Sequence, residues 1–286
     1  MQFSVIAGPH ITEAHKREMR GSTPVSVIVI THNPGEEFYW CMDSLFKAAK
    51  HTPLEIIVID NASESSFKKI IKEVEAKSKS LPVKNFKVVY NERNYGYAVA
   101  GNTGAHLASF DVLAFVNPDV IVPEDIFERC LEILLNYEKC GVVSCALIDF
   151  RGRYLPESFR GEPAILSLAA KFIGFHKIFS YSRKLGRYYS EFMKDVKPHT
   201  AEVISGAFFL ARKSIFFEAG GFNEDYFLYV EDIDFSISVR KKGFSIMHLP
   251  DLFCMHKKGA SARKKELLAI FHFYYSMYKF ARRHYG

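Results

Sequence analysis

The stretch VSVIVIT at residues 25–31 is short, apolar apart from Ser26 and the final Thr31, and rich in β-branched residues. It is followed by the turn-forming residues His32-Asn33-Pro34-Gly35. An apolar run of this length without polar alternation is typical of a strand that is buried on both faces, as in a parallel sheet. We therefore take it as the first strand of an α/β sheet.

The same pattern continues along the chain. Residues 36–50 carry apolar side chains at helical spacing, and residues 54–60 repeat the strand pattern, which predicts a right-handed parallel crossover. The next elements alternate in the same way: a helix over 65–79, a strand over 86–90, a helix over 97–109 and a strand over 112–116. Four strands alternating with helices are typical of a nucleotide-binding α/β half.

The second half of the chain is less regular. Helices are predicted over residues 123–137 and 231–242, and strands over 142–148, 202–212 and 245–249. Residues 151–198 have no strong period, and two interpretations stay open: a mobile or acceptor-facing insertion, or a helical subdomain.

Composition excludes several classes of protein. With 286 residues and 48% hydrophobic content, the chain can bury a sizeable core, which excludes a disordered protein or a disulfide scaffold. A net charge of +6 is too modest for a dedicated nucleic-acid binder, so no nucleic-acid partner is predicted. The five scattered cysteines, the missing signal-peptide order and the lack of a membrane-spanning apolar run predict a cytoplasmic protein.

Polar residues stand where three predicted parallel strands end: Thr31-His32-Asn33, Asp60-Asn61 and Asn117-Pro118-Asp119. A single Asp or Asn in such a place is commonly a turn former or a helix cap. Three strand ends in one sheet favour a ligand site, because ligands of α/β sheets bind at the carboxyl ends of the strands. The chain has no G-x-G-x-x-G after the first strand, no P-loop and no G-x-S-x-G, which disfavours dinucleotide enzymes, P-loop NTPases and α/β-hydrolases.

Six segments occur in an order that is found in a known family: VSVIVITHNPGEE, LEIIVIDNAS, NERNYGYAVAGNTGA, DVLAFVNPDV, VISGAFFLARKSIFFEAGGFNEDYFLYVEDIDF and HLPDLFCMHKKGAS. In these segments the chain resembles the inverting family 2 glycosyltransferases with a GT-A fold, in particular their rhamnosyltransferase-like branch. The resemblance implies a mostly parallel central sheet with helices on both faces. It also implies an N-terminal extension (1–24), a nucleotide-sugar-binding half (25–122), an acceptor-binding and catalytic half of the same domain (123–260) and a C-terminal basic aromatic helix (261–286).

The resemblance implies a binding site for a nucleotide-diphosphate sugar. The residues that it assigns to this donor are Thr31, Asn33, Asp60, Asn61, Arg93, Asn94, Gly96, Asn102, Asn117, Asp119, Gly206, Ala207 and Lys257. A carboxylate at position 60 suits contact with a nucleotide base, because it can accept a hydrogen bond from a pyrimidine N–H. The basic segment from Lys257 onward is interpreted either as a flap over the diphosphate or as a solvated charge run.

By the same resemblance, Asp119 and His256 hold a divalent ion, Mn²⁺ or Mg²⁺, on the diphosphate. Asn117 stands where many relatives carry a first Asp, which leaves Asp119 as the charged ligand there. We therefore expect low metal affinity in the absence of nucleotide.

The resemblance assigns the general base to Asp232, with Glu231 beside it; helix capping is the alternative explanation of these acids and of Asp234. The predicted reaction is inverting transfer of a sugar, rhamnose in particular, to a hydroxyl of a glycan or lipid-linked glycan. Two alternatives are a sugar-phosphate nucleotidylyltransferase and a non-catalytic sugar-nucleotide-binding module. The first expects a Gly-rich, Arg-containing loop after the first strand, which is missing, and the retained acids argue against the second.

The last segment, residues 266–285, is a predicted helix whose aromatic residues cover more than one face. Three interpretations follow: packing into the core, a homodimer contact, or peripheral contact with the inner face of a membrane. A lipid-linked acceptor would give the third interpretation a purpose.

Overall fold

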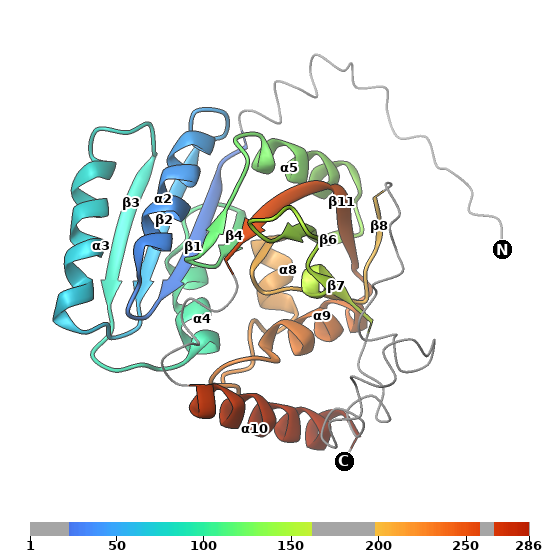
Figure 1. Cartoon of the computed structure of the whole chain (residues 1–286). Coiled ribbons are helices and arrows are strands. Elements are labelled where there is room, and N and C mark those ends of the chain that lie inside the picture. Colours follow the sequence, from blue (N-terminus) through green and yellow to red (C-terminus); the bar gives the residue numbers. More distant parts are fainter. Residues whose placement is uncertain (1–22, 162–197, 258–265, 286) are drawn as a thin grey trace.

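The computed structural model describes residues 23–161, 198–257 and 266–285 (Figure 1). Most of the N-terminal extension, most of the insertion at 151–198 and most of the basic segment after Lys257 therefore lie outside the described residues. The described part is built around one large mixed sheet of order β3-β2-β1-β4-β10-β6-β11-β5, with β8 paired to β11.

The first half of this sheet is parallel. Its strands are β1 (Val25–Thr31), β2 (Leu54–Asp60), β3 (Asn85–Tyr90) and β4 (Val112–Val116). The helices that connect them are α2 (Glu36–Ala48), α3 (Ser65–Ser78) and α4 (Tyr97–Leu107). β1 pairs in parallel with both β2 and β4, so the predicted crossovers are present.

The second half is joined to the first by an antiparallel strand. β10 (Phe208–Arg212) lies between β4 and β6 (Cys140–Ile148) and is antiparallel to both. β11 (Ser245–His256) runs parallel to β6, and the short strands β5 (Val120–Ile121) and β8 (His199–Thr200) are antiparallel to β11. The remaining elements are α5 (Ile126–Asn136), the 3₁₀ turn η1 (Pro156–Ser158), β7 (Phe159–Arg160), β9 (Val203–Ile204), α8 (Lys213–Glu218), α9 (Glu231–Lys241) and α10 (Glu266–Tyr285).

Both faces of the sheet are covered by helices, as the alternation along β1 shows. Val27 and Val29 belong to one buried cluster, with residues of α2 and α5, whereas Ile28 and Ile30 belong to a second cluster on the other face. Side chains of a strand alternate between faces, so a strand with helices on both sides must be apolar throughout. The expected α/β architecture, a central sheet with helices on both faces, is confirmed.

Two predicted strands differ substantially from those in the structure. The strand predicted over 202–212 is two strands, β9 and β10, separated by a turn at residues 205–207. The last strand is longer than predicted, because β11 continues to His256 through an irregularity between Leu249 and Phe253. The helix over 266–285 is confirmed with the predicted bounds.

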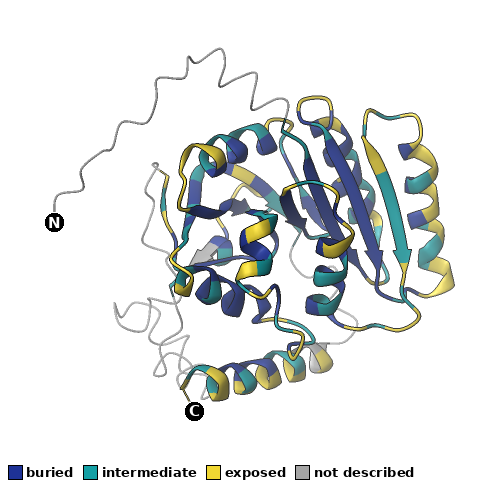
Figure 2. Ribbon diagram, turned by 180° about the vertical axis from the view of Figure 1, so that it is seen from behind, coloured by how far each residue is buried: buried dark blue, intermediate teal, exposed yellow. Residues whose placement is uncertain are grey.

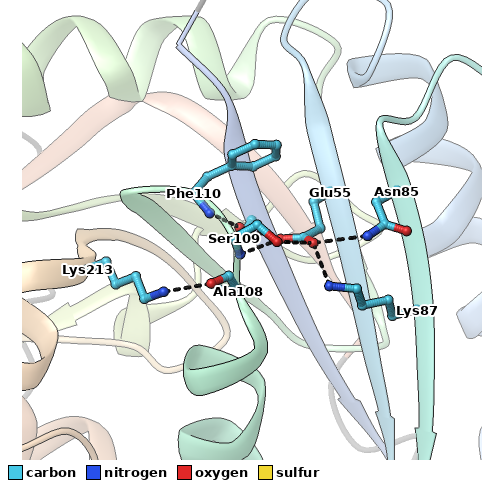
Figure 3. A network of polar contacts seen from close by, with 8 residues as sticks. Glu55, Asn85, Lys87, Ala108, Ser109, Phe110 and Lys213 are labelled. Atoms are coloured by element: carbon cyan, nitrogen blue, oxygen red, sulfur yellow. Dashed lines mark hydrogen bonds and ion pairs between the residues drawn. The ribbon is translucent and has the colours of Figure 1, made fainter.

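A buried carboxylate ties the amino ends of the parallel strands together (Figure 3). Glu55 at the start of β2 is 1% exposed and accepts hydrogen bonds from the Ser26 hydroxyl at 2.8 Å and from the backbone N–H of Ser109 at 2.8 Å. Lys87 of β3 approaches it at 3.1 Å. Burial by itself would raise the pKa of Glu55, but these hydrogen bonds outweigh it and lower the pKa to about 2.

No helix among the described residues is both long enough and apolar enough to cross a membrane.

Candidate active site

The predicted ligand side chains at the ends of β1 and β2 lie next to each other. Thr31 and Asp60 are register partners, and both are buried. Oδ1 of Asp60 accepts the backbone N–H of Ser63 at 3.1 Å, while Oδ2 of Asp60 and the hydroxyl of Thr31 are buried without a hydrogen-bond partner in the described structure. Buried polar atoms of this kind require an explanation, and a bound polar ligand supplies one.

The loops after these two strands are tied to each other. Asn33 has a positive φ of 53°, its backbone N–H donates to the Ser63 hydroxyl at 2.7 Å, and its Oδ1 accepts the backbone N–H of Glu64 at 2.8 Å. Asn tolerates this left-handed conformation better than most residues. The loops therefore form one rigid unit at the carboxyl edge of the sheet.

Asn61 organises the loop that follows β3. Its amide donates to Oδ1 of Asn94 at 2.7 Å and to the carbonyl of Gly96 at 3.0 Å, and its Oδ1 accepts from Asn91 at 3.1 Å and from the N–H of Tyr95 at 3.0 Å. These bonds use all the hydrogen-bonding capacity of the side chain. In this structure Asn61 positions the loop that contains the predicted donor residues.

Asn102 has a comparable role farther along α4. Its side chain bonds both the N–H and the carbonyl of Phe222, at 2.9 and 2.8 Å, and donates to Glu224 at 2.9 Å. Arg93, by contrast, is exposed, with its guanidinium 4.8 Å from the centre of the Tyr95 ring. Of these two predicted donor residues, Arg93 offers its charge to solvent and Asn102 is engaged within the protein.

Gly96 brings the donor loop against the aromatic segment that precedes α9. Its φ is +87°, and a Cβ built on it would lie 2.4 Å from the carbonyl oxygen of Phe227. That carbonyl also accepts the N–H of Tyr97 at 2.7 Å. Only glycine fits both the conformation and the approach.

The predicted metal ligands are brought together by the pairing of β5 with β11. Oδ1 of Asp119 lies 3.3 Å from Nε2 of His256, and both side chains are largely buried. Nδ1 of His256 is buried without a partner in the described structure. Carboxylate oxygen and imidazole nitrogen suit Mn²⁺, and carboxylate oxygen suits Mg²⁺. No group of three or more His, Cys, Asp or Glu side chains that could hold a metal ion occurs in the described ranges.

Residues of the first half of α2 lie beside Asp119 and His256. The Cys41 thiol lies 3.5 Å from the carbonyl of Asn117, and burial, followed by the charge of Asp119, raises its pKa. The ammonium of Lys257 is 3.7 Å from a carboxylate oxygen of Glu37 and 4.8 Å from the centre of the Trp40 ring. Neither Glu37 nor Trp40 was predicted from the sequence, because both lie on an ordinary amphipathic helix.

Asp232 lies in the first turn of α9 and is 8% exposed. Its Oδ2 accepts the backbone N–H of Gly206 at 3.0 Å, and its Oδ1 accepts the N–H of Ile233 at 2.9 Å. The residue after Gly206, Ala207, accepts the N–H of Asn117 at 2.9 Å. Gly206 and Ala207 therefore connect the predicted base to the turn that holds the predicted metal ligand.

Tyr97 also contacts this arrangement, although nothing in the sequence marked it as a site residue beyond its position after Gly96. Its hydroxyl donates to the carbonyl of Gly206 at 3.1 Å. Burial, together with the negative charges of Glu231 and Asp232, raises the pKa of Tyr97 well above its usual value. The phenol is therefore protonated and remains a donor across the working range of pH.

The turn before α9 has an unusual backbone. Tyr229 and Val230 have φ values of 68° and 76°, and for a β-branched residue such as valine this conformation is strained. The hydroxyl of Ser276 on α10 donates to the carbonyl of Leu228 at 2.9 Å, and Val230 packs in a cluster with Phe280. Backbone strain is found at functional sites where the surroundings hold it in place.

Asp234, for which capping was an alternative explanation, instead holds α10. It is 2% exposed, and its Oδ1 lies 2.6 Å from Nε2 of His284 and 3.6 Å from Nε of Arg283. In Figure 1, α10 runs beneath α9. The last helix is thus fixed to the element that begins with Glu231 and Asp232.

Comparison with known proteins identifies relatives of this chain. The family described as "Glycosyl transferase family 2" matches residues 26–218. The N-acetylglucosaminyl-diphospho-decaprenol L-rhamnosyltransferase of Mycobacterium tuberculosis is 25% identical over 275 residues, which cover 91% of this chain and 85% of the relative. Rhamnosyltransferase WbbL of Escherichia coli is 25% identical over 150 residues, which cover 52% of this chain and 53% of the relative.

Solved structures share the fold. A mannosyltransferase, PcManGT from Pyrobaculum calidifontis in complex with GDP-Man and Mn²⁺, superposes with a TM-score of 0.62 at 16% identity, covering 92% of this chain and 65% of that one. GalNAc-T7 with UDP, GalNAc and Mn²⁺ superposes with a TM-score of 0.59 at 17% identity, covering 82% of this chain. The chain spans 44% of the length of GalNAc-T7, so this likeness concerns the shared fold alone.

Proposed function

Because the chain belongs to glycosyl transferase family 2, we propose that it is an inverting glycosyltransferase that moves a sugar from a nucleotide-diphosphate donor to a hydroxyl of a glycan acceptor. One observation carries this proposal: the bridge from Asp232 through Gly206 and Ala207 to Asn117. It places a carboxylate in the first turn of a helix beside the turn that contains Asp119. Single displacement at a sugar carbon needs a base close to the site of the diphosphate. This bridge joins the proposed base to the turn of the proposed diphosphate site.

Asp232 is the proposed general base. The acceptor hydroxyl gives its proton to the carboxylate of Asp232 while its oxygen attacks the anomeric carbon, and the bond from that carbon to the diphosphate oxygen breaks. A single displacement inverts the anomeric configuration. The N–H groups of Gly206 and Ile233 fix the plane of the carboxylate, so its orientation is set before the substrates bind.

Asp119 and His256 are the proposed ligands of a divalent ion. Their facing side chains and the buried, unpartnered Nδ1 of His256 fit this role, and two protein ligands leave room for diphosphate oxygens and water. When bound, such an ion neutralises the charge of the departing diphosphate. Mn²⁺ accompanies GDP-Man in the structure of PcManGT and UDP and GalNAc in that of GalNAc-T7, which supports a manganese or magnesium site here.

Thr31 and Asp60 are the proposed contacts of the nucleoside, because their buried, unpartnered oxygens lie at the carboxyl edge of the parallel strands. Arg93 and Lys257 supply positive charge near the same edge. Asn61, Asn94 and Asn102 are proposed to shape the pocket rather than to touch the donor.

Rhamnose is the proposed sugar, and a lipid-linked glycan the proposed acceptor. Both rest on the similarity to the mycobacterial protein, whose name specifies rhamnose transfer to a diphospho-decaprenol-linked sugar. A cytoplasmic location is proposed with them, because all five cysteines are buried free thiols, as is typical of a reducing compartment.

The test is a thermal-shift screen of nucleotide sugars with and without Mn²⁺, followed by transfer from the best donor to a lipid-linked saccharide. A ligand that binds only the folded protein raises the unfolding temperature with its concentration. We expect a thymidine or uridine diphosphate sugar to bind more tightly with Mn²⁺ and its sugar to be transferred with inversion, seen by NMR of the product.

Two outcomes would contradict the proposal. Release of pyrophosphate from a nucleoside triphosphate and a sugar phosphate would assign a nucleotidylyltransferase instead. Tight donor binding without turnover, over a panel of acceptors, would assign a binding module.

A further inference from the structure

The first half of α2 carries a carboxylate and an aromatic ring that the proposed function does not use. Figure 2 shows the central strands of the sheet buried, with exposed positions on the helices and on the turns. Trp40, the single tryptophan of the chain, is at such a position on α2 and is 40% exposed. Glu37 precedes it by three positions, so the two side chains lie on the same face of the helix. Both contact Lys257, the residue that follows His256.

The backbone of Lys257 is fixed beside the proposed diphosphate site. Its N–H donates to the carbonyl of Asp119 at 3.1 Å, directly after β11 ends at His256. The helix α2 reaches the same place, because the Cys41 thiol lies 3.5 Å from the carbonyl of Asn117. The Lys257 side chain therefore starts next to the residues that are proposed to hold the ion and the diphosphate.

Two contacts hold the ammonium of Lys257 without using its hydrogen-bond donors. Nζ lies 3.7 Å from Oε2 of Glu37, which is an ion pair but is longer than a hydrogen bond. Nζ also lies 4.8 Å from the centre of the Trp40 ring, and the attraction of a cation to an aromatic face occupies no N–H group. An ammonium has three N–H donors, so these contacts leave all of them to other acceptors, such as phosphate oxygens.

The two groups that hold the ammonium are themselves held in place. The Trp40 ring meets the ring of Phe150 at 5.9 Å in an edge-to-face contact. Oε1 of Glu37 accepts the N–H of Gly35 at 3.0 Å, and the Glu37 side chain is only 14% exposed. This carboxylate fits because residue 35 is a glycine, since a Cβ there would lie 2.8 Å from both of its oxygens. The position of the ammonium is thus set by side chains that have little freedom of their own.

We propose that Glu37 and Trp40 are positioning residues, which hold the ammonium of Lys257 in place for the diphosphate of the donor. A lysine side chain that is free in solution loses conformational entropy when it binds an anion, and holding it beforehand reduces that loss. The inference deepens the proposed function and rests on it, because the ligand of Lys257 is the donor diphosphate. Helix-dipole stabilisation alone would explain an acid in the first turn of α2, but it does not require a partner for that acid.

The experiment is a double-mutant cycle on nucleotide affinity. Calorimetry with Mn²⁺ present measures the Kd of uridine, thymidine and guanosine diphosphate, and the tightest of them is the probe. Lys257→Met removes the charge at similar length and should weaken binding about ten-fold or more, because a charge-assisted hydrogen bond is lost. Trp40→Leu and Glu37→Gln should each weaken binding by about three- to ten-fold. In the Lys257→Met background, neither substitution should have a further effect.

Two further variants separate position from charge. Glu36→Gln removes an equal charge from an exposed position in the same turn of α2, so it measures the general effect of removing an acid near an anionic ligand. Glu37→Gln should bind the probe more weakly than this control. Gly35→Ala keeps every charge, and its φ of −98° suits alanine, but the new Cβ should displace the Glu37 carboxylate. It should weaken binding about as much as Glu37→Gln does.

Four results would overturn the inference. Equal losses by Trp40→Leu or Glu37→Gln with and without Lys257 would assign a direct contact with the ligand or a purely structural role. Tighter binding by Glu37→Gln than by Glu36→Gln would show that the carboxylate competes with the diphosphate. Unchanged affinity of both Trp40→Leu and Glu37→Gln would show that the lysine needs no positioning. Unchanged affinity of Lys257→Met would leave nothing to position.

The unmodified protein tests the proposed function separately. Binding of none of the three diphosphates would defeat both the proposed function and this inference. Tight binding of a diphosphate without sugar transfer from any donor would defeat only the proposed function. Transfer by the unmodified protein, with a diphosphate affinity that depends on Lys257 but not on Glu37 or Trp40, would defeat only this inference.

Discussion

The backbone N–H of Gly206, in the turn between β9 and β10, donates to Oδ2 of Asp232 in the first turn of α9 at 3.0 Å. A Cβ at position 206 would lie 3.4 Å from Cβ of Asp232, so the two residues are in van der Waals contact. Because the carbonyl of the same Gly206 accepts the Tyr97 hydroxyl, this residue is held from both sides. The position of the carboxylate is thus set by residues far from it in the sequence.

Replacing Asp232 by Asn should abolish transfer while donor binding is retained. The amide oxygen can still accept the N–H of Gly206, while the amide nitrogen can no longer accept the N–H of Ile233, so the unfolding temperature is measured beside turnover. The side chain can no longer take a proton. We expect turnover to fall by about 10²–10⁴-fold, the usual contribution of a general base. Asp225→Asn, an exposed acid that precedes α9, is the control and should be active. Normal turnover by the Asp232 variant would refute the assignment.

Tyr97→Phe should lower turnover by roughly ten-fold without changing donor affinity. The substitution leaves the carbonyl of Gly206 without its donor, which typically costs about 1–3 kcal/mol. Turnover and donor affinity are measured separately, by transfer kinetics and calorimetry. Tyr95→Phe, on the same loop and 37% exposed, should be neutral. If both variants behave alike, the contact between Tyr97 and Gly206 has no role in positioning the base.

Asp119→Asn should remove the effect of Mn²⁺ on nucleotide binding. In the unmodified protein we expect Mn²⁺ to raise the unfolding temperature further when a nucleoside diphosphate is present, because the proposed site supplies two protein ligands and the phosphates would supply others. The variant should show the same small shift with and without the ion. Asp125→Asn changes an exposed carboxylate at the start of α5 and should respond as the unmodified protein does.

Glu55→Gln should destabilise the protein at neutral pH and remove part of its acid sensitivity. The pKa of Glu55 is lowered from 4.5 to about 2, so its ionised form favours the folded state above pH 4.5, and this contribution is lost as the pH falls from 4.5 toward 2. A pKa shift of this size corresponds to ~3 kcal/mol in the free energy of unfolding. Urea unfolding at pH 7 and pH 3 should show a larger difference between variant and unmodified protein at pH 7. Glu92→Gln, which is exposed, should show no difference at either pH.

His284→Ala should weaken both the fold and the reaction. Loss of its contact with buried Asp234 should lower the free energy of unfolding by about 1–3 kcal/mol. Turnover should fall as well, since α10 holds the strained turn at Tyr229 and Val230. Arg282→Ala, which changes an exposed position on the same helix, is the control. A His284 variant with lowered stability but unchanged turnover would show that the turn is held without α10.

The parallel half of the fold was predictable because its signals are local. An uninterrupted run such as VSVIVIT identifies a doubly buried strand by itself, and the amphipathic helices between the strands fix their direction. The division of residues 202–212 into β9 and β10 was not predictable, because the apolar pattern continues across it. In the turn between these strands Gly206 donates to Asp232, and that contact spans 26 positions of the chain.

The positions of the candidate site residues at strand ends were predictable from the sequence, but the hydrogen-bond partners of their side chains were not. Asp60, Asp119 and His256 are at strand ends, where the topology brings them to one edge. Nothing in the sequence distinguishes Asn61 and Asn102 from residues that contact a ligand. In the structure their side chains bond to loops that only the folded chain brings near. The positioning contact of Tyr97 was missed for the same reason, since its partner lies 109 positions away.

Strand β10 makes the first half of the protein vulnerable while it is being synthesised. β4 ends at Val116, but the strand that covers its open edge begins at Phe208, 92 positions later. Until that segment leaves the ribosome, a buried apolar strand presents unpaired N–H and carbonyl groups, which invites pairing with another nascent chain. Production of the protein should therefore depend on chaperones or low temperature, and fragments that end before residue 208 should aggregate.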